Sequence, residues 1–122
     1  MGSINERRKH PRLEKNIPVK LCGEEFDVVT ETKNLSCAGA YCRVDKYFEP
    51  MTKLEIHLLL PFKKNGKIVT KKFSCNGVVV RTESLPGSEY FNIAIFFNEI
   101  DKKDAKVLTD FVNASLYEKT NA

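Results

Sequence analysis

Hydrophobic and polar residues alternate in short runs along most of the chain, a pattern typical of half-buried β-strands. The clearest run is Lys53–Leu60, in which every second residue is apolar: Leu54, Ile56, Leu58 and Leu60. Pro61 follows, and we expect it to end this strand because proline cannot donate a backbone hydrogen bond. The same pattern predicts strands at Ile17–Cys22, Phe26–Thr32, Ala40–Val44, Lys67–Thr82 and Tyr90–Phe97.

Turn-forming residues separate these runs. Gly23-Glu24-Glu25 predicts a first hairpin, and Asn65-Gly66 predicts a tight turn of the primed type. Gly77 lies inside a long run and is expected to mark a bend or bulge. Pro86-Gly87-Ser88 predicts another turn, and Asn34–Gly39 is expected to lie in a loop between two strands.

The end of the chain changes to helical periodicity. Asp101 is expected to cap a helix, with Asp104 in the first turn, where the helix dipole favours a negative charge. A helical apolar stripe follows, formed by Val107, Leu108, Phe111, Val112 and Leu116. About six strands and one helix predict a mainly β fold, a small six-stranded antiparallel β-barrel with a C-terminal α-helix, over residues 17–118.

Residues 1–16 contain too few large apolar side chains to bury a face, and we expect them to form a flexible arm. The arm is basic. Residues 1–20 hold six basic and two acidic side chains, whereas the remaining 102 residues carry fourteen of each sign. This uneven distribution within a chain of net charge +4 points to an anionic partner that is met at the N-terminal end.

Several classes of protein fit the sequence poorly. No apolar run is long enough to span a membrane, and no secretory segment is visible. The four cysteines form no C-x-x-C pair and have no histidine at zinc-like spacing, so we expect free thiols in a cytoplasmic protein and no metal site. No nucleophile motif, carboxylate pair or phosphate-binding glycine pattern accompanies His10 or His57, so we expect no enzymatic activity.

Two short elements have side chains suited to a nucleotide. In an extended arm Arg8 and Arg12 point to the same side, roughly 13 Å apart, and a guanidinium can bind phosphate or the O6/N7 edge of guanine. Asn34 and Ser36 offer an amide and a hydroxyl, and Gly39 permits close approach of a ligand. Taken singly, each has a simpler interpretation: a solvated charge cluster for the first, and a polar turn bonded to its own backbone for the second.

In their order and spacing, these elements resemble the paired signature of the PilZ domain family. Arg8-Lys9-His10-Pro11-Arg12 is similar to its R-x-x-x-R motif, and Asn34-Leu35-Ser36-Cys37-Ala38-Gly39 is similar to its [D/N]-x-S-x-x-G motif. Gly77–Arg81 also resembles the G-x-V-x-R strand of the family. The chain departs from the family at Asn92-Ile93-Ala94, where a glycine is usual.

The resemblance implies a receptor for the second messenger cyclic di-GMP and no bound cofactor. It implies that Arg8 and Arg12 clamp the ligand from the arm, that Asn34 and Ser36 contact a guanine edge, and that Gly39 shapes the loop. Arg7, directly before the motif, favours two stacked ligand molecules over one. Closure of the arm would alter contacts with a partner protein. The alternatives are a ligand-independent PilZ-like adaptor and a small nucleic-acid-binding barrel, against which the neutral body of the chain argues.

Overall fold

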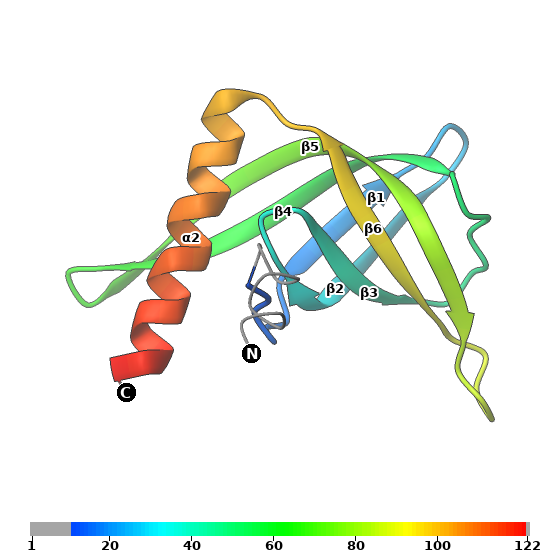
Figure 1. Cartoon of the computed structure of the whole chain (residues 1–122), viewed down its shortest axis with the longest axis horizontal. Coiled ribbons are helices and arrows are strands. Elements are labelled where there is room, and N and C mark those ends of the chain that lie inside the picture. Colours follow the sequence, from blue (N-terminus) through cyan, green and yellow to red (C-terminus); the bar gives the residue numbers. More distant parts are fainter. Residues whose placement is uncertain (1–10, 122) are drawn as a thin grey trace, which may run out of the picture.

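The computed structural model describes residues 11–121, with side chains as far as Glu118. Six antiparallel strands form a closed barrel, and helix α2 (Lys102–Asn121) lies beside it (Figure 1). The order around the barrel is β1-β2-β3-β6-β5-β4, and β1 pairs with β4 to close the ring. The strands are β1 (Pro18–Cys22), β2 (Asp27–Leu35), β3 (Gly39–Val44), β4 (Lys53–Lys64), β5 (Lys67–Ser84) and β6 (Phe91–Glu99). The predicted fold class is confirmed.

The alternating positions of the strands form the core. Leu54, Ile56, Leu58 and Leu60 in β4 are each no more than 3% exposed. Burying one such side chain contributes about 1.5–3 kcal/mol, so the period-2 pattern supplies much of the driving force for barrel closure. Inward-facing residues of the other strands complete the core, among them Leu21, Leu35, Cys42, Phe73, Val79 and Ile93.

The β4–β5 hairpin confirms one prediction and corrects another. Asn65 and Gly66 have φ values of 53° and 77°, as a primed turn requires. Strand β4 does not end at Pro61, which continues the strand opposite Thr70 of β5. The pairing of β1 with β4 reaches only as far as Leu58, so Pro61 lies where β4 has one free edge and proline is tolerated.

Two further boundaries follow from the pairing of the strands. The register between β5 and β6 shifts between Asn76 and Gly77, which confirms the predicted bulge. Strand β2 extends to Leu35, and Asn34 pairs with Tyr41 of β3. The prediction that Asn34 lies in a loop is therefore wrong, because cross-strand pairing continues through this polar residue.

Helix α2 is capped and packed as predicted. The side chain of Asp101 accepts a hydrogen bond of 3.0 Å from the backbone of Asp104. Leu108, Phe111 and Val112 are each 1% exposed. The ring of Phe111 meets Phe62 of β4 edge to face at 5.6 Å, which docks the helix on the β4–β5 side of the barrel. Within residues 11–121 there is no helix apolar enough over a sufficient length to cross a bilayer.

Residues 11–16, which the sequence assigned to the flexible arm, are attached to the barrel. Leu13 is 4% exposed and exchanges two backbone hydrogen bonds with Leu35, of 2.8 and 2.9 Å. The buried hydroxyl of Thr32 donates to the carbonyl of Lys15 at 2.8 Å and accepts from the amide of Ile17 at 3.0 Å. One leucine is enough to attach this segment because it packs into a core that the barrel strands provide.

We expect the substitution Thr32→Val to destabilise the fold by about 1–3 kcal/mol, because valine keeps the shape of threonine but leaves the buried amide of Ile17 and the partly buried carbonyl of Lys15 without their partner. Unfolding in urea measures the difference. Thr70→Val, at an exposed position of β5, is the matched control and should change the free energy of unfolding by less than about 0.5 kcal/mol. Equal effects of the two substitutions would contradict an anchoring role for Thr32.

Candidate functional site

A cleft of about 170 Å³ brings together four residues of the two sequence motifs. Arg12 comes from the N-terminal segment. Asn34 lies near the end of β2, Ser36 lies in the turn that follows, and Gly39 begins β3. The remaining lining residues are Ala38, Ala40, Tyr41, Val80, Ala94, Ile95 and Phe96. Arg7 and Arg8 lie outside the described residues.

Strand register explains how residues distant in sequence share this cleft. Asn34 pairs with Tyr41, Tyr41 with Ala94, and Ala94 with Arg81, so one row crosses β2, β3, β6 and β5. The pairing of Leu13 with Leu35 places Arg12 beside the same row. Barrel closure and one short bridge therefore assemble the cleft.

Ser36 shapes the turn between β2 and β3. Its side-chain oxygen accepts hydrogen bonds from the backbone amides of Ala38 at 3.1 Å and Gly39 at 3.2 Å. Its own backbone amide donates to the carbonyl of Gly39 at 2.9 Å. With 7% exposure and these partners, the Ser36 hydroxyl organises the turn, in the way expected of a polar turn bonded to its own backbone.

Gly39 is needed for the close approach of β3 to β6. A Cβ atom at this position would lie 2.1 Å from the carbonyl oxygen of Ile95, a backbone atom that has little room to move. The absence of a side chain also keeps the floor of the cleft open. The sequence identified Gly39 for its permissive geometry, and the structure supplies the physical reason.

Among the residues that line the cleft, Arg12 and Asn34 have polar side chains that are available to bind a ligand. The side chain of Arg12 is exposed, and that of Asn34 is half-buried. Neither has a side-chain hydrogen bond to another group in the part of the chain that the structure describes. A guanidinium offers five donors and a carboxamide offers both donors and an acceptor, so together they can bind a polar, anionic ligand.

Sequence reasoning missed the apolar floor of the cleft. Val80 is 51% exposed and Phe96 is 49% exposed, and both contribute outward-facing surface to the cleft. The sequence does indicate Phe96, because it stands between the inward-facing Ile95 and Phe97 of β6 and must point outward. An exposed aromatic ring in a cleft is suited to stacking against a flat ligand.

Tyr41 is held at the side of the cleft by an ionic network. Its hydroxyl donates a hydrogen bond of 2.6 Å to Glu83, which also pairs with Arg81 at 3.3 Å. The hydrogen bond to Glu83, and after it burial, raises the pKa of Tyr41 above its usual value. The tyrosine therefore stays neutral, with its ring fixed beside Asn34.

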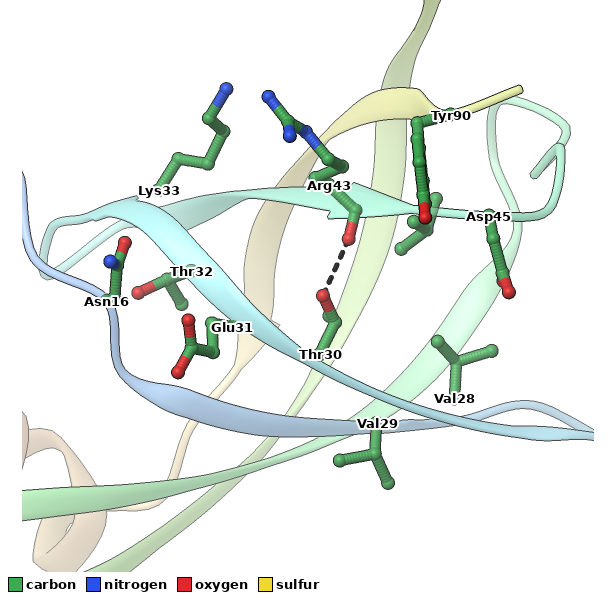
Figure 2. Close-up of a pocket in the computed structure, with 11 residues that line it drawn as sticks. Asn16, Val28, Val29, Thr30, Glu31, Thr32, Lys33, Arg43, Asp45 and Tyr90 are labelled. Carbon is green, nitrogen blue, oxygen red and sulfur yellow. Dashed lines mark hydrogen bonds between the residues drawn. The ribbon is translucent and has the colours of Figure 1, made fainter. Parts of the chain in front are cut away.

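A larger hollow of about 480 Å³ lies between β2 and β3 where the two strands stop pairing (Figure 2). The hydroxyl of Thr30 bridges this gap with a hydrogen bond of 2.6 Å to the carbonyl of Arg43. The lining of this hollow contains two basic residues, Lys33 and Arg43, and two acidic residues, Glu31 and Asp45. We favour the smaller cleft, because its cationic and amide groups meet an aromatic floor without acidic neighbours in its lining.

His57 points away from the core, as the alternation of β4 predicts, but it has partners that the sequence did not indicate. Its Nδ1 lies 2.8 Å from the hydroxyl of Ser74, and its Nε2 lies 3.1 Å from a carboxylate oxygen of Glu55. In a hydrolytic triad the serine contacts Nε2 and the acid contacts Nδ1. This arrangement is reversed, so the group does not have the geometry of a catalytic triad.

The barrel, its packed helix and the cleft at the β2–β3 turn define a small single-barrel domain. The sequence matches the family model of the PilZ domain over residues 6–114, and the chain belongs to this family. The resemblance inferred from the motifs is therefore confirmed for the family.

Two solved structures share the fold. The inhibitor of motility MotI/DgrA of Bacillus subtilis superimposes with a TM-score of 0.75 at 23% identity, covering 91% of this chain and 52% of that one. MrkH of K. pneumoniae superimposes with a TM-score of 0.58 at 15% identity, covering 91% and 51%. The chain thus spans about half the length of each of these proteins. No curated protein sequence matches it.

We expect Gly39→Ala to destabilise the fold by about 1–3 kcal/mol, because the added methyl group overlaps the backbone of β6. Thermal and urea unfolding measure this effect. Gly66→Asn is the control, since no atom lies within 4 Å of its Cβ position and asparagine tolerates the positive φ of that turn. A Gly39→Ala protein as stable as the control would show that β3 and β6 separate easily.

Proposed function

We propose that the chain binds cyclic di-GMP in the cleft between Arg12 and the β2–β3 turn. The observation that carries this proposal is the meeting of Arg12, Asn34 and Phe96 at one cleft. Cyclic di-GMP presents two phosphates and two guanines, which match a guanidinium, a carboxamide and an aromatic surface. Membership of the PilZ family supports the same ligand.

Each group has a distinct role in this proposal. Arg12 binds a phosphate or the O6/N7 edge of guanine, both of which accept two hydrogen bonds from one guanidinium. The carboxamide of Asn34 accepts from the N1–H or the exocyclic amine of the guanine. Phe96 and Val80 support the flat face of the base, while Ser36 and Gly39 hold the turn in shape.

In this proposal the small size of the cleft leaves part of the ligand for the residues before Pro11 to contact. A volume of about 170 Å³ is smaller than the ~300 Å³ at which ligand pockets usually begin, so most of the dinucleotide would lie above the rim. In the proposal Arg8 covers this exposed part and completes the clamp with Arg12. Arg7, beside it, favours binding of two stacked ligand molecules.

The signal would leave through the surface formed by residues 11–16 and helix α2. Lys15 donates a hydrogen bond of 3.3 Å to Ser115 and lies 5.3 Å from the ring centroid of Phe111. Cys37, in the motif turn, lies 3.8 Å from the hydroxyl of Thr109. A ligand that reorders the clamp therefore acts directly on α2 and alters its contacts with a partner protein.

The free thiols of this chain accord with a cytoplasmic location.

We expect Arg12→Ala to lower the affinity for cyclic di-GMP about 10- to 150-fold, because charge-assisted hydrogen bonds are worth about 1.5–3 kcal/mol. Arg8→Ala should have a similar effect, and Asn34→Ala a smaller one. Isothermal titration calorimetry gives the affinity and the number of ligands per chain. Arg43→Ala removes an exposed arginine of the larger hollow and should bind normally.

If the wild-type chain binds no cyclic di-GMP but still binds a partner, the ligand-independent adaptor is the correct interpretation. If Arg43→Ala weakens binding and Arg12→Ala does not, the ligand belongs in the hollow between β2 and β3.

One observation favours the alternative of a nucleic-acid-binding barrel. The sequence between Glu55 and Glu83 contains no acidic residue, and its β4–β5 hairpin carries Lys63, Lys64, Lys67, Lys71 and Lys72. Lys71 lies 4.8 Å from the ring centroid of Phe62. Residues 21–122 are neutral in total, yet the β4–β5 hairpin is a basic projection. Sequence reasoning overlooked it because the charge was summed over all of residues 21–122.

We expect the full chain to cause no shift of single- or double-stranded DNA or RNA in a gel at physiological salt, because this projection has no exposed run of aromatic residues for base stacking. A salt-sensitive shift that disappears in a Lys63→Gln/Lys64→Gln/Lys67→Gln variant would contradict this expectation and favour nucleic-acid binding. The same variant should retain the affinity of the wild type for cyclic di-GMP.

A further inference from the structure

A second group of ligand-type side chains lies on the outer surface of the barrel. Cys22 of β1 pairs with Glu55 of β4, and His57 follows two residues later on the same face of β4. The Cys22 sulfur, a Glu55 carboxylate oxygen and a His57 ring nitrogen all lie within 4.8 Å of one another. Asp27 pairs with Cys22 across the β1–β2 hairpin.

This group is separate from the cleft. Asp27 begins β2 and Asn34 lies seven residues further along the same strand, which corresponds to roughly 23 Å. Neither Cys22, Glu55 nor His57 lines the cleft. The function of this group can therefore be tested independently of the ligand that the cleft binds.

The donor atoms suit a borderline transition metal. Zinc accepts thiolate, imidazole and carboxylate ligands in tetrahedral geometry, with bond lengths that put neighbouring donor atoms about 3.3–3.6 Å apart. The Nε2 of His57 and the Glu55 oxygen are already 3.1 Å apart. Rotation of the Cys22 side chain and of the exposed Glu55 side chain would bring the sulfur to the same distance, because both belong to adjacent paired strands.

The orientation of the His57 ring also fits a ligand. Its Nδ1 lies 2.8 Å from the hydroxyl of Ser74 on β5, which can accept the Nδ1 proton. Without a metal, Nε2–H can donate to Glu55 while the Ser74 hydroxyl donates to Nδ1; when a metal takes the Nε2 lone pair, Nδ1–H can donate to the same hydroxyl. Metal-binding histidines are usually held in this way by a partner on the opposite nitrogen.

The charges around the group are mainly negative. Cys22 pairs with Asp27 on one side and with Glu55 on the other, and Lys20 lies two residues before it in β1. Lys20 pairs with Asp27 at 3.6 Å on an exposed surface, where such pairs are weak. A divalent cation would neutralise the two carboxylates, and Asp27 could exchange Lys20 for the metal.

We propose that Cys22, Glu55 and His57 form a binding site for a divalent transition metal of the zinc class, with Asp27 as the fourth ligand. The site joins β1 to β4, the pair of strands that closes the barrel. The sequence did not indicate it, because its ligands come from strands paired in space and show no motif spacing.

Cobalt(II) is the probe for this site, since thiolate ligation gives it a charge-transfer absorption band. Full-length, untagged, reduced protein is titrated with cobalt(II), and zinc is then added. We expect a band that saturates at one cobalt per chain and disappears when zinc displaces it. Zinc should also raise the melting temperature of the protein, because a metal bound to the folded state stabilises it.

Three variants assign the ligands. Cys22→Ser should lose the band, whereas Cys37→Ser, at the other partly exposed cysteine, should keep it. Cys42 and Cys75 are buried, so neither is expected to reach the added cobalt. Glu55→Gln alters an exposed side chain, should fold normally, and should weaken cobalt binding at least about tenfold.

The proposal is overturned if the wild type gives no saturable thiolate band, if Cys22→Ser retains the band, or if Glu55→Gln binds cobalt as tightly as the wild type. Circular dichroism establishes that each variant is folded. None of these results depends on the binding of cyclic di-GMP, so the site and the receptor function succeed or fail separately.

Discussion

Two backbone hydrogen bonds between Leu13 and Leu35 join the basic N-terminal segment to the barrel, and the candidate site depends on them. Without this bridge Arg12 would have no fixed position relative to Asn34. The burial of Leu13 and the two hydrogen bonds of the Thr32 hydroxyl strengthen the attachment. The segment therefore belongs to the folded domain at least from Leu13 onward, and it carries an arginine to the edge of the cleft.

The same attachment connects the cleft to the helix. Lys15 follows Leu13 by two residues and contacts Ser115 and Phe111 of α2, and Cys37 of the motif turn lies near Thr109. A change at the cleft has a short route to a surface that a partner protein can contact. In the proposed function, these contacts carry the signal from the cleft to α2.

The sequence predicted what local chemistry decides. Alternation identified the core face of β4, Asn65-Gly66 identified a primed turn, and Asp101 identified the start of α2. It failed where pairing in space decides the outcome. Pro61 remains in a strand because its edge is free, and Asn34 remains in a strand because Tyr41 pairs with it.

The same distinction applies to the sites. The two motifs identified Arg12, Asn34, Ser36 and Gly39, which the structure brings to one cleft, but they could not show that the Ser36 hydroxyl is committed to its own turn. Phe96 and the group around His57 are assembled by strand register, which no spacing along the chain reveals. The sequence also did not indicate that the side-chain oxygen of Asn92 is buried without a hydrogen-bond partner within the described residues.

The proposed function requires the ligand to bind in the cleft at the β2–β3 turn. Proton–nitrogen correlation spectra of the full chain, recorded during a titration with cyclic di-GMP, test it most directly. We expect the largest shifts at Arg12, Asn34, Tyr41 and Phe96, with smaller ones at Thr109 in α2. Shifts centred on Arg43 and Tyr90, in the hollow between β2 and β3, or the absence of any shift, would contradict it.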